Sequence, residues 1–60
     1  MKISELMVMK SAAGWYVGRT YEEDGIDGFP YSRDSGYYRS KAEAQFQLRY
    51  MIEREVNNVN

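Results

Sequence analysis

The hydrophobic positions of this chain follow a strand-like pattern over its first half and a helix-like pattern over its last third. Residues 5–10 (ELMVMK), with Ile3 as an alternative start, and residues 15–23 (WYVGRTYEE) are short runs with β-branched and aromatic residues, which are typical of strands. The SAAG stretch between them has turn character, and four-residue hairpin connections are common. The two runs are therefore predicted to pair as antiparallel strands.

Side-chain alternation predicts which face of the second strand is buried. One face carries Trp15, Val17, Arg19 and Tyr21, and the other carries Tyr16, Gly18, Thr20 and Glu22. The first set is the more apolar, so it is predicted to face the core. The glycine of the second set indicates either a bulge or the close approach of another backbone.

The next segment has few strand-like features. Residues 24–34 (DGIDGFPYSRD) are interpreted as a loop, because they contain two Asp-Gly steps and the only proline of the chain. Residues 35–39 (SGYYR) are predicted to form a short third strand. The pattern leaves open which of Tyr37 and Tyr38 faces the core.

A helix is predicted to begin after Ser40. This serine and Glu43 match the S-x-x-E capping box, in which the hydroxyl accepts from the Glu43 amide and the carboxylate reaches back to the Ser40 amide. No glycine or proline interrupts the chain from there to about residue 56, and Asn57 and Asn58 offer a natural stop.

The predicted helix carries two apolar stripes. Ala44, Leu48, Met51 and Ile52 form one, with Val56 at its margin, and Ala42, Phe46 and Tyr50 form the other. A helix on one sheet can bury only one stripe, and the first is predicted to pack on the sheet. Phe46 and Tyr50 are then exposed, either as a local pair on the helix surface or as a docking surface.

The order of elements predicts an α+β fold, in which a three-stranded antiparallel sheet carries one C-terminal helix on one face. The whole chain, residues 1–60, is predicted to form a single small domain. Because these are only two layers, the far face of the sheet is expected to be bare. Tyr16, Thr20 and one of Tyr37 and Tyr38 are expected to lie on that face.

Composition limits the chemistry. The chain has no histidine and no cysteine, which excludes thiol nucleophiles and Ser-His-Asp arrangements and removes the usual acid–base side chain. The chain is therefore predicted not to be an enzyme, with no catalytic residues and no cofactor. The acidic residues between positions 22 and 27 do not fit the spacing of a calcium-binding loop, so no metal site is predicted either.

Exposed aromatic residues and uneven charge remain as candidates for function. Tyrosine is enriched at protein interfaces, and an acidic edge can address a basic protein surface, such as one that holds nucleic acid. The main prediction is a non-enzymatic protein-binding module whose partner is a host protein complex or a second copy of the chain. The predicted contact residues are Tyr16, Glu22, Glu23, Asp24, Asp27, Tyr37, Tyr38, Phe46 and Tyr50.

The alternative prediction is a small sheet-face DNA- or RNA-binding protein. In it Arg19, Arg33 and Arg39 contact phosphates, and Tyr16 and Tyr37 stack on bases. The net charge of −1 supplies no global field for nucleic acid. Because the sequence shows neither a signal-peptide pattern nor an apolar run of about 20 residues, a cytoplasmic location is expected and no membrane contact.

The stretch GYYRSKAEAQFQL, in which a short aromatic strand runs into a capped helix, resembles part of a known module. Over residues 15–50 the predicted order is similar to the arm-site-binding N-terminal domains of tyrosine recombinases, which implies a three-stranded DNA-reading fold. Size, acidity, absent cysteine and exposed aromatics also resemble small proteins of phages and mobile elements, including anti-CRISPR inhibitors. That resemblance implies stoichiometric binding to a host complex, in the host cytoplasm.

Overall fold

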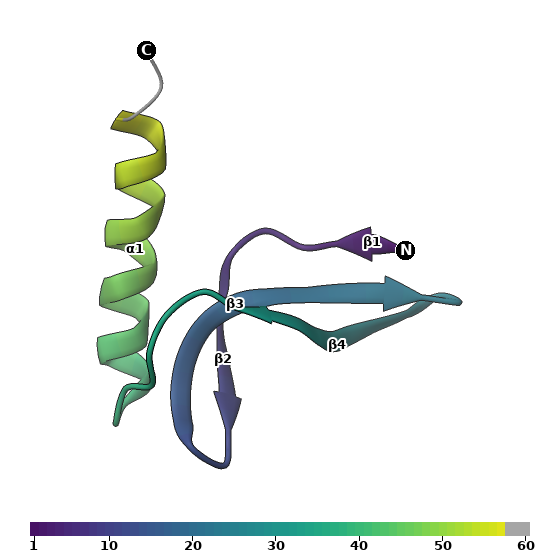
Figure 1. The fold of residues 1–60 in the computed structure, drawn as a ribbon, viewed down its shortest axis with the longest axis horizontal. Coiled ribbons are helices and arrows are strands. Elements are labelled where there is room, and N and C mark those ends of the chain that lie inside the picture. Colours follow the sequence, from purple (N-terminus) through teal and green to yellow (C-terminus); the bar gives the residue numbers. More distant parts are fainter. Residues whose placement is uncertain (58–60) are drawn as a thin grey trace.

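The computed structural model describes residues 1–57 of the chain, so the predicted stop at Asn58 lies outside the described residues. The elements are β1 (Lys2–Ile3), β2 (Met7–Ser11), β3 (Gly14–Glu23), β4 (Ile26–Arg33) and α1 (Lys41–Asn57) (Figure 1). The predicted α+β class is confirmed, with an antiparallel sheet followed by a C-terminal helix. The sheet has four strands where three were predicted.

The sheet is built around β3, which pairs on both of its edges. On one edge β2 pairs with the first half of β3 (Ser11 opposite Gly14), and β1 pairs with the second half (Ile3 opposite Tyr21). On the other edge β4 pairs with the second half only, from Gly18 onward. The predicted antiparallel pairing of the first two runs is confirmed, but the first run is divided into β1 and β2.

The division of the first run lies at Ser4, which remains attached to β3. Its amide donates to the Thr20 carbonyl at 2.9 Å, and its hydroxyl accepts from the Thr20 amide at 2.9 Å. The Arg19 guanidinium donates to the Ser4 carbonyl at 3.0 Å. The two residues that follow Ser4 leave the sheet, and β3 bends at this level, so that its second half points away from the helix (Figure 1).

The loop predicted for residues 24–34 is wrong, because residues 26–33 form β4. Asp24 (φ 53°) and Gly25 (φ 78°) both have positive φ, as a two-residue type I′ hairpin turn requires. Pro30 is tolerated in β4 because this strand lies at the edge of the sheet. Pro30 pairs with Thr20, beside the point where the register of the two strands shifts.

The third strand predicted for residues 35–39 is also wrong, because only Tyr38 pairs with β3. Its amide donates to the Trp15 carbonyl at 2.6 Å, and the Trp15 amide donates to the Tyr38 carbonyl at 2.9 Å. Between this bridge and β4, the Ser35 hydroxyl accepts from the Val17 amide at 2.8 Å. The Ser35 side chain thus takes the place of the backbone carbonyl that a paired strand would offer to Val17. Residues 35–37 therefore leave the edge of β3.

Gly18 marks a close backbone approach, as its position predicted. A Cβ atom here would collide with the Ser32 carbonyl oxygen of β4 and would lie 3.0 Å from Cε2 of Tyr16. Only glycine therefore allows β4 to pair at this point, where the sheet bends.

The helix begins where the capping box predicts, and its orientation is confirmed. The Ser40 hydroxyl accepts from the Glu43 amide at 3.1 Å, while the return bond from the Glu43 carboxylate is not among the hydrogen bonds of the described residues. Ala44 is fully buried, whereas Phe46 is 69% exposed and Tyr50 51% exposed.

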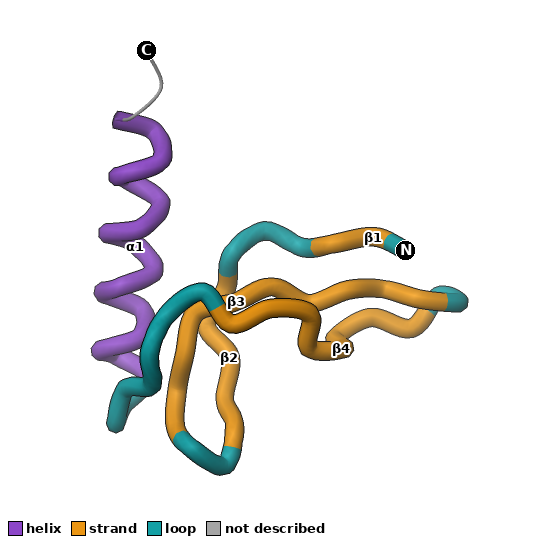
Figure 2. Tube along the Cα trace, in the orientation of Figure 1, coloured by secondary structure: helices purple, strands orange, loops and turns teal. Residues whose placement is uncertain are grey.

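The helix lies on the predicted face of the sheet, but of the four residues predicted to face the core only Val17 is buried. The Lys41 ammonium lies 6.0 Å from the centre of the Trp15 ring, and Ile52 lines a hollow together with Arg19. The helix outruns the sheet, however (Figure 2). Ile52 is 45% exposed and Val56 68% exposed, so the predicted core stripe is covered only over its first half.

The expectation of a bare far face is wrong at Tyr16, which is 7% exposed. The ring of Tyr37 meets it edge-on, with centroids 5.7 Å apart, because the segment after β4 folds back over this face. Thr20, expected on the same face, is also buried. Tyr37 stays half exposed, and Tyr38 is the more covered of the two tyrosines.

The core is small and the molecule is flat. Among the described residues only Tyr16, Val17 and Ala44 are buried hydrophobic side chains. The radius of gyration is 12.3 Å, against about 10 Å for a compact domain of this length. With extents of 34 × 33 × 14 Å, the helix and the second half of the sheet form two limbs at an angle (Figures 1 and 2).

Candidate docking surface on the β-arm

The limb that points away from the helix, here called the β-arm, consists of β1, residues 19–23 of β3 and β4. It carries an aromatic cluster. Tyr21 and Phe29 are directly opposite in the β3–β4 ladder, and their rings stack with centroids 5.3 Å apart. The ring of Tyr31 meets Tyr21 edge-on at 6.3 Å. Such pairs are held by ring contacts as well as by the strand ladder.

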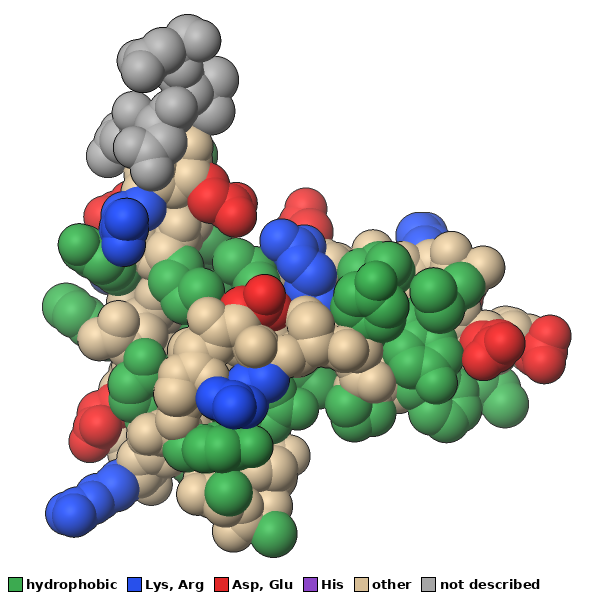
Figure 3. All heavy atoms as spheres, in the orientation of Figure 1, with side chains coloured by type: hydrophobic (Ala, Val, Ile, Leu, Met, Phe, Trp, Pro, Cys, Tyr) green, Lys and Arg blue, Asp and Glu red, His purple; other side chains and the backbone are tan. Residues whose placement is uncertain are grey.

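Ile3 extends this cluster across β1, because it lies directly opposite Tyr21 and therefore on the same face. We call Ile3, Tyr21, Phe29 and Tyr31 the arm patch. Ile3 is 42% exposed, Phe29 39% and Tyr31 50%. Hydrophobic side chains gather along the arm in the space-filling view (Figure 3). The arm patch therefore gathers partly exposed apolar side chains on one face, as interaction sites do.

The arm patch continues the face that the helix covers elsewhere. Tyr21 follows Val17 and Arg19 in the alternation of β3, so it belongs to the predicted core face. The helix lies over the other end of β3 and does not extend along the arm (Figure 1). The prediction of Tyr21 as a core residue is therefore only half correct, because this ring is partly covered by its aromatic neighbours and not by the helix.

The end of the arm is acidic. Glu23, Asp24 and Asp27, called the acidic tip, are exposed around the hairpin turn. Acidic side chains are visible at this end in Figure 3. The Asp27 carboxylate accepts from the Gly28 amide at 2.7 Å. Glu22 differs from these residues, since it is half-buried and lies opposite Lys2 in the β1–β3 ladder.

Metal binding is not supported at the acidic tip. Within residues 1–57, no three acidic side chains come close enough together to hold an ion. What the tip presents is a set of separate negative charges beside an apolar surface. Charges in that position act on the approach of a charged partner.

The other predicted contact residues do not join the arm patch. Phe46 and Tyr50 lie on the outer side of the helix, where the Arg54 guanidinium is 5.8 Å from the Tyr50 ring centre. Tyr37 lies under the Arg33 guanidinium, 4.8 Å from its ring centre. Tyr16 is covered. The predicted set is thus spread over three separate regions of the molecule.

Two of the three arginines of the nucleic-acid alternative are engaged by backbone carbonyls. Arg19 donates to the Ser4 carbonyl, and Arg33 donates to the Ser35 carbonyl at 2.7 Å while it covers Tyr37. Arg39 lines a hollow of about 410 Å³ together with Lys10 and Tyr37. Arg33 and Arg39 thus both lie near Tyr37, whereas Arg19 is held at Ser4.

Sequence reasoning missed Ile3, Phe29 and Tyr31 as surface contacts. The last two fall in the predicted loop, where no alternation of side chains indicates which face they lie on. The signal that could have found them is the Asp24–Gly25 step, since an Asp-Gly pair between alternating residues is the strongest short hairpin signal. A hairpin at this position places Tyr21 and Phe29 side by side.

Comparisons of the chain with protein-family models, curated proteins and solved structures found no match. Within residues 1–57, no helix is both long enough and apolar enough to cross a membrane.

Proposed function

We propose that this chain is a non-enzymatic protein-binding module that docks through its β-arm onto a basic surface of another protein. The observation that supports it most is the stack of half-buried Tyr21 with exposed Phe29 beside the acidic tip. The helix and the small core anchor the other end of β3, and the arm extends from them.

The composition of the arm matches what protein interfaces use. Aromatic side chains bring large contact area with few rotatable bonds, and they dominate binding energy when they lie at the centre of an interface. Surrounding charges contribute mainly to the rate of association and to the choice of partner. In this arrangement the arm patch supplies the affinity, and the acidic tip selects a partner with positive charge.

A basic surface that normally holds nucleic acid is the partner class that fits this charge. Binding there excludes the nucleic acid, so the chain would act as a stoichiometric inhibitor of a nucleic-acid-handling complex in the cytoplasm. A phage or mobile-element origin and a CRISPR-type defence complex as the target agree with the resemblance in size and charge. Direct binding of DNA or RNA is disfavoured because Arg19 and Arg33 are engaged by backbone carbonyls and the net charge is −1.

The test is capture of a partner from bacterial lysate by the wild type and by a charge-neutral variant. The variant combines Glu23→Gln, Asp24→Asn and Asp27→Asn, and asparagine tolerates the positive φ at position 24. Capture should fall about tenfold and lose much of its salt dependence, because the charges act on association. Glu5→Gln, an exposed acid off the tip, is the matched control and should bind normally.

Retention on DNA at two salt concentrations tests the alternative in the same set of variants. A nucleic-acid binder loses affinity steeply with salt, since counterions are released from the phosphates. Strong, salt-dependent retention of the wild type, with unchanged protein capture by the neutral variant, would reject the proposal in favour of the alternative.

A further inference from the structure

The second half of the helix presents a stripe that the rest of the described chain covers only in part, since Leu48 is half-buried and Ile52 is 45% exposed. Its open side is formed by Gln45, Leu48, Arg49, Ile52 and Glu53, all from the helix itself. Ile52 also lines a hollow of about 250 Å³, which it shares with Leu6 and Arg19. The stripe is separate from the β-arm, while Glu53, seven residues after Phe46, borders the outer side of the helix that carries Phe46 and Tyr50.

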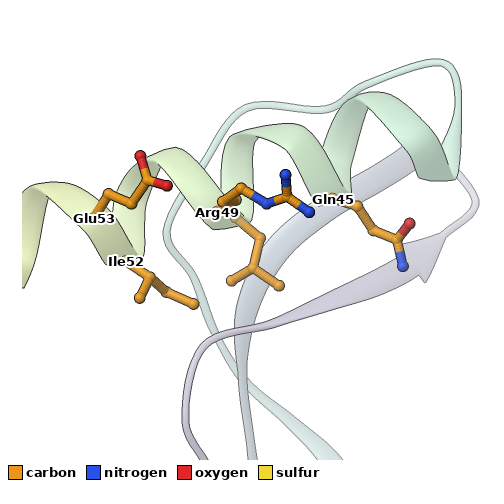
Figure 4. A pocket seen from close by; sticks show the side chains of 5 residues that line it. Gln45, Arg49, Ile52 and Glu53 are labelled. Atoms are coloured by element: carbon orange, nitrogen blue, oxygen red, sulfur yellow. The ribbon is translucent and has the colours of Figure 1, made fainter.

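The stripe points sideways from the sheet. At about 100° per residue, Gln45 and Ile52 are about 80–100° round the helix from Ala44, which faces the sheet. Arg49 and Glu53 follow on the next flank, and Figure 4 shows these four side chains on successive turns.

The stripe complements itself when it is reversed. In an antiparallel pair of identical helices related by a two-fold axis near Met51, Arg49 of each copy falls opposite Glu53 of the other. Both residues lie on the same flank, which is the condition for this contact. Along the seam Ile52 meets its own copy, and Leu48 lies between Ile52 and Val56 of the other chain.

We propose that this stripe binds the same stripe of a second copy of the chain, so that the protein is an antiparallel, two-fold symmetric dimer. The complementary charges of Arg49 and Glu53, which this axis brings opposite each other, favour a second copy as the occupant. The dimer covers Ile52 and the exposed part of Leu48. The β-arm of each copy stays uncovered, so the proposal does not depend on the function of the arm.

Charge reversal with mixing tests the proposed pairing. Arg49→Glu and Glu53→Arg should each weaken self-association at least about tenfold in sedimentation equilibrium, because the symmetry places two repulsive contacts in the dimer. Each variant also places two like charges four residues apart in its own helix, where they repel each other. Only the mixing experiment separates that repulsion from the loss of contact between copies. In the equimolar mixture each chain again faces opposite charges, so dimers of near wild-type affinity should return.

A wild type that stays monomeric at about 1 mM would overturn the proposal, since this implies less than about 4 kcal/mol of binding. A wild-type dimer whose single variants are unaffected, or whose mixture stays dissociated, would overturn it as well. Both exposed positions should tolerate substitution, which circular dichroism of each variant checks.

Cross-linking supplies a second measurement that needs no charge change. The chain has no cysteine, so Ile52→Cys introduces a single thiol, which should form a disulfide-linked dimer rapidly on mild oxidation. Tyr50→Cys, on the opposite side of the same helix, is the matched control and should cross-link at least about tenfold more slowly. Equal rates at the two positions would contradict the proposed seam.

Discussion

The two halves of β3 have the same alternating sequence pattern and very different surroundings. In the first half, Tyr16 is 7% exposed and Val17 is fully buried, so both faces are covered. In the second half, Tyr21 is only partly covered, and its cross-strand neighbour Phe29 is 39% exposed. Burial along this strand is therefore decided by which distant segment folds over it, not by the alternation itself.

The largest expected effect is at the junction of the two halves. Gly18→Ala should destabilise the fold by about 3 kcal/mol, since the new methyl group meets a backbone carbonyl that cannot move without breaking the β3–β4 pairing. A domain of this size has about 3–5 kcal/mol in total, so chemical denaturation should find it largely unfolded. Gly36→Ala, with open space around it, is the control and should be neutral or slightly stabilising.

A smaller loss of stability is expected when the Ser35 hydroxyl, which bonds the covered half of β3, is removed. Ser35→Ala removes the acceptor of the Val17 amide, a buried donor, and should cost about 1–3 kcal/mol in urea denaturation. Ser32→Ala removes a hydroxyl that bonds Asp34 at the surface and should stay within about 0.5 kcal/mol. Equal losses would show that the Val17 amide finds another acceptor.

The next largest effect on stability is expected at the N-terminal cap of the helix. Ser40→Ala should destabilise by about 1 kcal/mol and lower the melting temperature by roughly 4–8 °C, because the Glu43 amide loses its acceptor. Ser40→Asp keeps an acceptor at the same position and should melt like the wild type. An unchanged melting temperature for the alanine variant would mean that the hydroxyl contributes nothing at this end.

The helix, its cap and its buried stripe could be predicted because the residues that decide them are neighbours in sequence. Ser40 and Glu43 are one turn apart, and Ala44 and Leu48 follow the helix period. The same reasoning held for the β2–β3 hairpin, whose turn is local.

The wrong prediction of the third strand and the failure to predict the arm patch have a different cause. In residues 24–34 the Asp-Gly steps and the proline both indicate a loop, whereas Asp24 and Gly25 form the tight turn of a hairpin and Pro30 lies in its edge strand. The prediction that Tyr16 lies on a bare face is wrong because the Tyr37 ring covers it. Tyr37 belongs to a segment whose path depends on the Ser35 hydroxyl. Contacts of this kind between distant residues cannot be derived from a period along one strand.

One paired substitution tests most directly whether the uncovered half of the sheet is the functional surface. Phe29→Ser and Phe46→Ser remove the same ring from two exposed positions, one in the arm patch and one on the outer side of the helix. We predict that both variants stay folded by circular dichroism and that partner capture falls about tenfold or more for Phe29→Ser alone. Capture that survives Phe29→Ser and is lost with Phe46→Ser would contradict the account.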